Sequence, residues 1–553
     1  MKKNSLISIN NNGEVIKVKS GTALFNILHT KINNFTVVAA LLNNKAVSLN
    51  THIYSDTDIS PLTTEHWEGE RIYRRSVTFL LLEAARQQFP EFNFELGASI
   101  GIAQWIQIKG LKDERLGLLT EKISLKMQEL IKENISFRVE SWPTEKAIKY
   151  FNENDKTEVA SFLHIWNQAK VSLISCNAVY FLSMGPLVPC AGFISNFQIK
   201  PVESGLILLA GETKGPDFTT NTVATYAKVV ERSKQWLNSM NITTVGSLNH
   251  ACVRGNISQI ITVAEGFHEK SIGQIADAIF IDKKKPRIIC IAGPSSSGKT
   301  TFIKRLSVQL QVNGLLPFSI SLDNYYIDRD KTIRDEKGNY YFEALEALDL
   351  PLLRQHLNTL LKGETVKTAK YLFTVGKSVP EGGDIINLPE NGILLLEGIH
   401  GLNPELIGNA VNNNRLFKIF IQPMNSLPFD AFSRVNPSDL RLLRRIIRDR
   451  YTRGQLPEDN IMRWYSVREG EKKHIYPYIN QADIVFDSSL IYELSVLKVY
   501  GERYLLEVPN THPAYTTAFR LRYLLNQFVS IYPDHVPRNS ILREFIGGST
   551  FEY

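Results

Sequence analysis

Residues 293–300 constrain the fold of this chain more than any other stretch of its sequence. They read Gly-Pro-Ser-Ser-Ser-Gly-Lys-Thr and fit the pattern G-x-x-x-x-G-K-[ST]. A β-branched apolar run, 288–292, comes before them, and a stretch with helical apolar spacing follows. The glycines let the backbone fold tightly enough for its N–H groups to surround a chain of phosphates. The segment therefore predicts a strand, a phosphate-binding loop and a helix in a domain that binds ATP or GTP.

Each polar side chain of this loop has a predicted task. The lysine adds a positive charge next to the β- and γ-phosphates, and the threonine hydroxyl can bind Mg²⁺. A serine-rich turn ahead of a helix is the alternative interpretation, but the flanking strand and helix patterns favour a nucleotide site. The residues predicted to bind ATP are Gly293, Ser295, Ser296, Ser297, Gly298, Lys299, Thr300 and Thr301.

Length and composition set the wider class of protein. At about 150 residues per domain, 553 residues suggest three or four domains. The net charge of +7 is small for this length, so it permits nucleic-acid binding without requiring it. No run approaches 18 apolar residues, and the first 15 residues lack the apolar core of a signal peptide. The four cysteines show no C-x-x-C spacing, which favours free thiols. These features predict a cytoplasmic protein with no membrane partner.

Residues 1–62 predict a small sheet-rich module. Alternating runs at 5–10 and 14–19 flank an Asn-Asn-Gly turn and indicate a β-hairpin. A helix is expected over 22–32, followed by further strands in 37–50. This order resembles the β-grasp TGS module of threonyl-tRNA synthetases and some GTPases. The resemblance implies an interaction or RNA-docking unit, and a spacer that packs on its neighbour is the alternative.

Residues 63–228 begin with an amphipathic helix and include the later segment 180–193. Both pieces resemble the α+β editing domain of threonyl- and alanyl-tRNA synthetases. In that family three histidines and a cysteine form the metal-binding or hydrolytic site. The matching positions here are Arg75, Phe79, Ser183 and Leu187, none of which is a normal imidazole or thiolate ligand. We therefore expect a retained scaffold that has no metal and no editing activity.

Two helical stretches complete the predicted domain order. Residues 229–284 alternate helix-like runs with breaks and are expected to form a connector. Its basic end, 283–285, is interpreted as a solvated face. Residues 496–553 are expected to pack as a helical extension of the domain at 285–495. The predicted fold is thus a multidomain α/β chain with a C-terminal parallel P-loop sheet covered by helices on both faces.

Two further strands are predicted to deliver carboxylates to the edge of this sheet. One strand ends before Asp323. A run of five apolar residues, 392–396, is followed by Glu397 and indicates another strand that is buried on both faces. Ligands bind beyond the carboxyl ends of such strands. Asp323 suits a base facing a hydroxyl, with a helix cap as the alternative. Glu397 suits a Mg²⁺ partner, with plain strand-end exposure as the alternative.

An arginine-rich stretch follows at 441–454. Alone it could bind nucleic acid, but after a phosphate-binding loop it is better interpreted as a lid, because guanidinium groups clamp phosphates and offset their charge during transfer. Arg444, Arg448 and Arg453 are the residues expected to close over the phosphates, with Arg448 counted among the catalytic groups.

Taken together, the motifs of 285–495 resemble the uridine kinase and phosphoribulokinase group of P-loop kinases. The shared order is G-x-x-x-x-G-K-T, D-N-Y-Y, F-E-A-L-E-A-L-D, Y-x-F, L-L-E-G-I and R-R-I-x-R-D-x-x-x-R-G. The resemblance implies that Asp323 is the general base for a nucleoside 5′-hydroxyl and that Lys299 holds the phosphates. Thr300 and Glu397 would hold Mg²⁺. The residues implied to contact the acceptor are Tyr325, Tyr326, Glu343, Tyr371, Phe373 and, as an extra contact, Arg468.

Departures from the uridine kinase pattern concern the acceptor. Glu343 replaces an aspartate, Leu345 a proline and Leu372 the aspartate of Y-D-F, while Gly376 aligns with a histidine that touches the pyrimidine. Phosphoryl transfer from ATP to a hydroxyl is therefore expected, with a nucleoside as acceptor. A sugar phosphate or another small hydroxyl acceptor is the first alternative. An RNA- or ribosome-associated ATPase switch is the second alternative. For Arg468, the alternative to an acceptor contact is a surface ion pair with a nearby glutamate. The sequence leaves the oligomeric state open.

Overall fold

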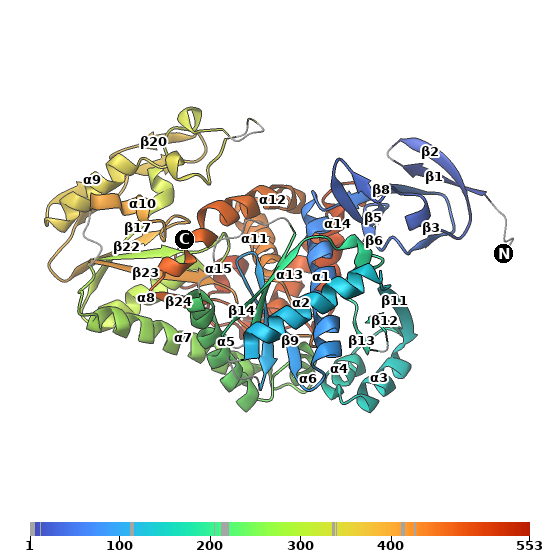
Figure 1. Cartoon of the computed structure of the whole chain (residues 1–553). Coiled ribbons are helices and arrows are strands. Elements are labelled where there is room, and N and C mark those ends of the chain that lie inside the picture. Colours follow the sequence, from blue (N-terminus) through green and yellow to red (C-terminus); the bar gives the residue numbers. More distant parts are fainter. Residues whose placement is uncertain are drawn as a thin grey trace.

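The computed structural model describes residues 6–11, 13–110, 115–177, 179–203, 205–211, 220–334, 338, 340–410, 415–424 and 427–552. The chain start at 1–5 and residue 12 of the predicted Asn-Asn-Gly turn lie outside the described residues. The N-terminal sheet lies at one end of the molecule and the C-terminal parallel sheet towards the other, with helices between them (Figure 1). Within the described residues, no helix combines the length and apolar character needed to cross a membrane.

The C-terminal domain is built on a five-stranded parallel sheet. Its strands follow the order β17 (Leu316–Ser321), β22 (Gly392–Glu397), β16 (Ile288–Ala292), β23 (Leu416–Gln422) and β24 (Ile484–Asp487). Alternate residues of the central strand β16 enter cores on opposite faces, which explains its continuous apolar run. Helix α8 (Lys299–Val312) shares one core and α9 (Leu350–Leu361) the other. The predicted parallel sheet with helices on both faces is confirmed.

The region predicted as a helical connector, 229–284, is helical and packs on this domain. The helices in this part of the chain are α5 (Thr220–Ser239), α6 (Val245–Val253) and α7 (Ile257–Ile281). Apolar residues of α7 share the core of α8, and Arg305 of α8 pairs with Glu265 at 3.5 Å and with Glu269 at 2.7 Å. Helix α7 therefore forms one of the layers over the sheet.

The N-terminal module has the sheet order β2-β1-β8-β5-β4, with β6 paired to β5. The predicted hairpin is present, but the helix predicted over 22–32 is wrong. The helical structure there is a single 3₁₀ turn, Leu24–Asn26, between the short strands β3 and β4, because the N–H groups of Leu24 and Phe25 donate to carbonyls of residues 49–51. The strands of this module are β1 (Leu6–Asn11), β2 (Glu14–Lys19), β3 (Thr22–Ala23), β4 (Lys31–Ile32), β5 (Phe35–Leu42), β6 (Lys45–Val47), β7 (His52–Ile53) and β8 (Thr57–Thr63).

The middle region packs the long helix α1 (Trp67–Gln88) against two antiparallel sheets, β14-β15-β10-β9 and β11-β12-β13. Arg75 and the segment around Ser183 and Leu187 do come together, since Arg75 bonds the carbonyl of Pro186. Phe79 and Leu187 are buried in the core. The elements here are β9 (Asn93–Ile100), β10 (Ala103–Lys109), α2 (Leu116–Lys132), β11 (Arg138–Pro143), α3 (Thr144–Glu153), α4 (Thr157–His164), β12 (Lys170–Cys176), β13 (Val179–Leu182), β14 (Phe197–Val202) and β15 (Gly205–Ala210).

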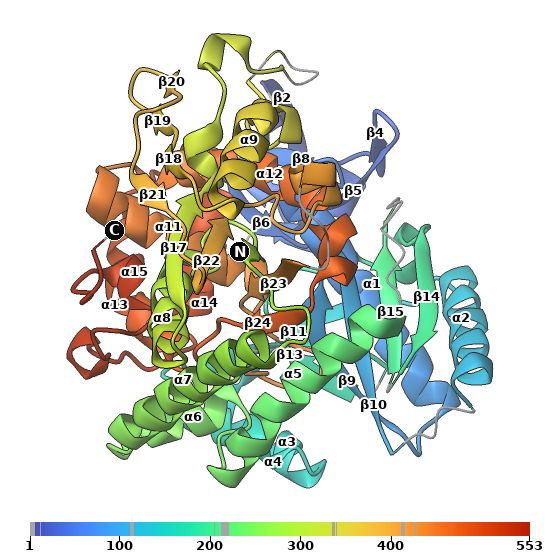
Figure 2. The same cartoon turned by 90° about the vertical axis from the view of Figure 1, so that its left-hand side faces the viewer.

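The C-terminal helices connect all three regions. Helix α14 (Tyr515–Leu525) bonds the N-terminal module through Thr516 and bonds Glu68 of α1 through Thr517 and Arg520. Figure 2 shows α11, α13 and α15 on one side of the parallel sheet. The remaining elements are β18 (Thr365–Lys367), β19 (Lys370–Leu372), β20 (Lys377–Val379), β21 (Ile385–Asn387), α10 (Pro404–Ile407), α11 (Pro437–Arg453), α12 (Pro457–His474), α13 (Glu493–Leu506) and α15 (Arg543–Ile546).

Candidate functional site

The loop between β16 and α8 has the tight backbone that the sequence predicts. Ser296 and Gly298 adopt positive φ values of 58° and 88°. A Cβ atom on Gly293 would lie 2.1 Å from the carbonyl oxygen of Ile421, so only glycine fits against β23. The first N–H groups of α8 have no carbonyl partner one turn earlier in the helix, which makes this helix end a candidate anion site, although the N–H of Thr301 donates to Glu544.

Lys299 lies over the loop that it follows. Its Nζ donates to the carbonyls of Gly293 at 3.0 Å and Pro294 at 3.3 Å. These are weak partners for an ammonium group compared with phosphate oxygens, because they carry no full charge. The lysine is therefore held where an incoming phosphate chain would meet it.

Thr300 and Glu397 meet at the carboxyl ends of β16 and β22, where the Thr300 hydroxyl donates to Glu397 Oε1 at 3.1 Å. Burial raises the pKa of Glu397, and the carboxylates of Glu544 and Asp323 raise it further, against the opposing charge of Lys299. Hard oxygen ligands in a region of excess negative charge fit Mg²⁺.

Asp323 stands on the 3₁₀ turn Leu322–Tyr325, directly after β17. Its side chain is open to solvent, as an incoming hydroxyl requires. The protein packed around the carboxylate raises its pKa, although Lys299 and Arg453 oppose the shift. A higher pKa makes this carboxylate a better proton acceptor than an ordinary aspartate.

A group of aromatic rings lies beside this aspartate. The Tyr371 ring lies 5.7 Å from that of Tyr326 and 5.0 Å from that of Phe373, measured between centroids. The pKa of Tyr326 is raised by burial and by the nearby charges of Asp323 and Glu343, which places both carboxylates close to this wall. Tyr326, Glu343, Tyr371 and Phe373 are therefore brought together as predicted.

Tyr325 does not belong to this wall. Its ring is 1% exposed, and its hydroxyl bonds Nδ1 of His356 on α9 at 3.0 Å. In the 3₁₀ turn after β17, the Tyr325 side chain enters the core shared with α9, whereas Tyr326 lies beside Tyr371. The expectation that Tyr325 contacts the acceptor is corrected accordingly.

The arginines of α11 divide into two groups, which changes the predicted lid. Arg444 is fully buried and its guanidinium donates to Glu493, to the carbonyl of Ser488 and to that of Ser296, so it supports the loop from behind. Arg448 donates to Asp449 at 2.9 Å. Arg453 pairs with Asp449 at 3.4 Å, and its side chain is 61% exposed. Its positive charge opposes the rise in the pKa of Asp323. Arg453 is thus the predicted arginine best placed to reach a phosphate.

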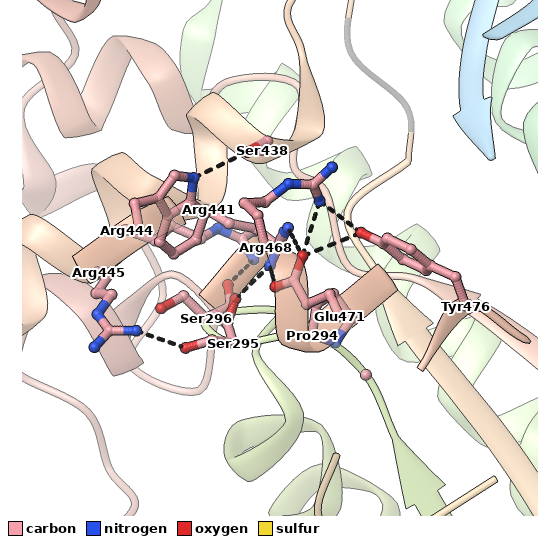
Figure 3. Close-up of polar contacts among 12 residues, drawn as sticks. Pro294, Ser295, Ser296, Ser438, Arg441, Arg444, Arg445, Arg468, Glu471 and Tyr476 are labelled. Atoms are coloured by element: carbon pink, nitrogen blue, oxygen red, sulfur yellow. Dashed lines mark hydrogen bonds and ion pairs between the residues drawn. The ribbon is translucent and has the colours of Figure 1, made fainter. Parts of the chain in front are cut away.

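Arg441, which was not among the predicted site residues, also supports the phosphate-binding loop. It donates to the carbonyl of Ser295 at 3.0 Å and to Glu471 of α12 at 2.8 Å (Figure 3). Arg468 donates to the same Glu471 at 2.8 Å and to the Tyr476 hydroxyl at 2.7 Å. The alternative ion pair expected for Arg468 is therefore present, although it lies inside the protein rather than on its surface.

Replacing Glu471 by alanine is expected to lower the free energy of unfolding by about 3–5 kcal/mol, because Arg441 and Arg468 would keep their charges without a partner. Burial alone would raise the pKa of Glu471, but these two arginines hold it below its usual range. Urea unfolding measures the loss. Glu469→Ala on the same helix, whose partner is Lys472, is the control. A loss below about 1 kcal/mol for Glu471→Ala, the scale of exposed pairs, would contradict the assigned role.

Glu544 is a second residue that sequence reasoning missed. Its Oε2 accepts from the backbone N–H of Thr301 at 3.1 Å and from the Thr301 hydroxyl at 2.8 Å. It comes from α15, far along the chain, so no local pattern could associate it with the loop. One of the N–H groups at the start of α8 is thus already bonded to a carboxylate.

Replacing Glu544 by glutamine is expected to tighten ATP binding about fivefold. The amide oxygen can still accept from Thr301, while one negative charge near the phosphates is removed, an effect of about 1 kcal/mol. Calorimetric titration of ATP measures the change, with Glu552→Gln at the exposed chain end as control. An unchanged or weaker affinity would contradict this placement of the carboxylate.

The chain is similar to known kinases over this domain. Residues 288–491 match the profile of the Phosphoribulokinase / Uridine kinase family. A uridine kinase of Deinococcus deserti is 29% identical over 202 residues, which cover 36% of this chain and 87% of that protein. One of Anoxybacillus flavithermus is 28% identical over 204 residues, covering 37% and 86%.

A different relative matches the N-terminal region. A threonine–tRNA ligase of Clostridium kluyveri is 29% identical over 184 residues, which cover 33% of this chain and 29% of that protein. The likeness is consistent with a synthetase-like front end and covers less than a third of the ligase.

Proposed function

We propose that the chain transfers the γ-phosphoryl group of ATP to the 5′-hydroxyl of a nucleoside, because residues 288–491 match the phosphoribulokinase and uridine kinase family. The observation that carries the proposal is Asp323, an accessible carboxylate of raised pKa beside Lys299 and the aromatic wall. A nucleotide switch that only hydrolyses ATP needs no such base. The acceptor is thus a bound hydroxyl compound.

In this proposal each side chain performs one task. The loop N–H groups and Lys299 hold the phosphates, and Arg453 offsets charge on the transferring group. Asp323 accepts a hydrogen bond from the acceptor hydroxyl, orients it and takes its proton. Thr300 and Glu397 would hold Mg²⁺, which neutralises charge on the β- and γ-phosphates when bound.

The acceptor site is proposed to hold a flat base and a sugar. Tyr326, Tyr371 and Phe373 offer ring faces and edges for a base, and Glu343 offers a carboxylate for sugar hydroxyls. Leu372 removes the polar group that reads the base in uridine kinases, so contact with the base would rest on stacking more than on hydrogen bonds.

A second acceptor class is favoured by Arg329. A Cβ atom on Gly376 would lie 2.6 Å from Nε of this arginine, which donates to the carbonyl of Phe373 at 2.7 Å. An arginine next to the position at which uridine kinases place a histidine favours an anionic acceptor such as a sugar phosphate.

The test is an ATP-consumption assay against nucleosides and small sugar phosphates, with products identified by mass. A nucleoside 5′-monophosphate supports the proposal. A phosphorylated sugar phosphate would move the assignment to the second acceptor class. ATP hydrolysis without any phosphorylated product, together with salt-dependent RNA binding, would instead support a nucleotide switch.

A further inference from the structure

A polar cavity lies where α1 meets the kinase domain, apart from the candidate active site. Its volume is about 180 Å³, and it is lined by α1, by the turn between β9 and β10, and by the segments around α11 and α12. Its wall includes the basic side chains Arg71, Arg74, Arg75, Arg434, Arg441 and Arg468, together with the carboxylates Glu70 and Glu469. We refer to it as the interdomain cavity.

Most of these arginines have carboxylate partners. Arg71 pairs with Asp439 at 2.6 Å, Arg74 pairs with Glu70, and Arg441 and Arg468 share Glu471. Arg75 differs. Within the described part of the chain it forms no ion pair, and its hydrogen bond to the carbonyl of Pro186, at 3.5 Å, is at the limit of a hydrogen bond.

The surroundings of Arg75 are electropositive. Burial and the like charges of Arg71 and Arg520 lower the pKa of Arg75 to about 10. Burial also lowers the pKa of Arg434, which donates to the carbonyl of Leu96, to about 10, although the charges of Glu95 and Asp487 oppose the shift. Arg75 is thus a buried guanidinium group on the cavity wall that has no ion pair in the described part of the chain and lies among other arginines.

We propose that the interdomain cavity binds a small phosphate dianion, either free phosphate or the phosphoryl group of a small phosphomonoester. Guanidinium groups present paired N–H donors that match tetrahedral oxyanions. At about 30 Å³ per water molecule, the volume corresponds to roughly six waters, which admits a phosphate group and excludes ATP.

The cavity has a direct connection to the kinase site. Arg468 and Lys472 of α12 line it, whereas Gly470, two residues away and so about 200° around the helix, packs against Glu343 of the acceptor site. Arg441 lines the cavity and also bonds the carbonyl of Ser295 in the phosphate-binding loop. The bound anion is therefore expected to change the rate of turnover. This effect on turnover rests on the proposed function, whereas binding of the anion to the cavity does not.

The test is calorimetric titration of orthophosphate into full-length Lys299→Ala protein, in which the phosphate-binding loop has lost its lysine. We expect saturable binding that Arg75→Met weakens about tenfold or more, because a charge-assisted contact is lost. Arg86→Met, on the same helix but paired with Glu83 outside the cavity, should bind like the parent. Arg434→Met provides a second variant should Arg75→Met fail to fold.

Titration of glycerol phosphate distinguishes the two sources of the anion, and sulfate serves as a third tetrahedral anion. Tighter binding of glycerol phosphate than of orthophosphate assigns the cavity to a phosphomonoester, and the reverse assigns it to free phosphate. Absence of saturable binding by all three anions overturns the proposal, as does binding that neither Arg75→Met nor Arg434→Met weakens. Anion binding without any kinase product would leave this proposal standing while removing the proposed function.

Discussion

Replacement of Lys299 by alanine is expected to lower kcat/KM for ATP about 10²–10³-fold, the usual cost of removing one group that stabilises charge in a transition state. The lysine lies over the loop within 3.3 Å of two backbone carbonyls, so its ammonium group lies where the proposed reaction needs it to meet phosphate oxygens. A coupled assay of ADP formation, with an acceptor identified in the panel, measures the effect.

The matched control is Lys362→Ala, an exposed lysine at the end of α9 on the far part of the domain. It should leave kcat/KM unchanged. Because the hydrogen bonds of the Lys299 ammonium among the described residues are to uncharged carbonyls, its removal should not unfold the protein. A Lys299→Ala enzyme within tenfold of the parent rate would remove the loop from the proposed reaction.

Asp323→Asn is expected to reduce kcat about 10²–10⁴-fold, the range for loss of a general base, while ATP binding stays within about twofold. The amide keeps the shape of the side chain but cannot take the hydroxyl proton. The thermal unfolding temperature should be unchanged or slightly higher, because the surrounding protein disfavours the ionised form. Single-turnover kinetics and ATP titration separate the two effects.

The pH dependence of the rate provides a second test of Asp323 as the general base. Since the pKa of Asp323 is raised, activity of the parent enzyme should fall with decreasing pH above the range of an ordinary aspartate. The residual activity of Asp323→Asn should lack this acid limb. Asp330→Asn, at a carboxylate that is 67% exposed, should keep both rate and limb. An Asp323→Asn enzyme with full activity would overturn the assignment of the base.

Local motifs predicted several residues that the structure brings together at the candidate site. The strand, loop and helix around Lys299 follow from glycine placement and apolar runs, and Asp323 and Glu397 follow because parallel strands bring their carboxyl ends to one edge. Tyr371 and Phe373 reach the same edge on a short hairpin, as the family resemblance implied. The N-terminal helix over 22–32 failed because its backbone donors bond a distant segment, which no local propensity records.

What the sequence by itself determined is the chemistry of the phosphate end, because a phosphate-binding loop is a local structure whose residues are neighbours in the chain. Only the tertiary structure decided which arginines are free to act. Arg444 and Arg453 belong to one motif, but the packing of α11 against α13 buries the first and leaves the second exposed. The same holds for Glu544 at Thr301 and for Arg75 in the interdomain cavity. Their environments depend on contacts between residues hundreds of positions apart, and burial and charge are properties of those contacts.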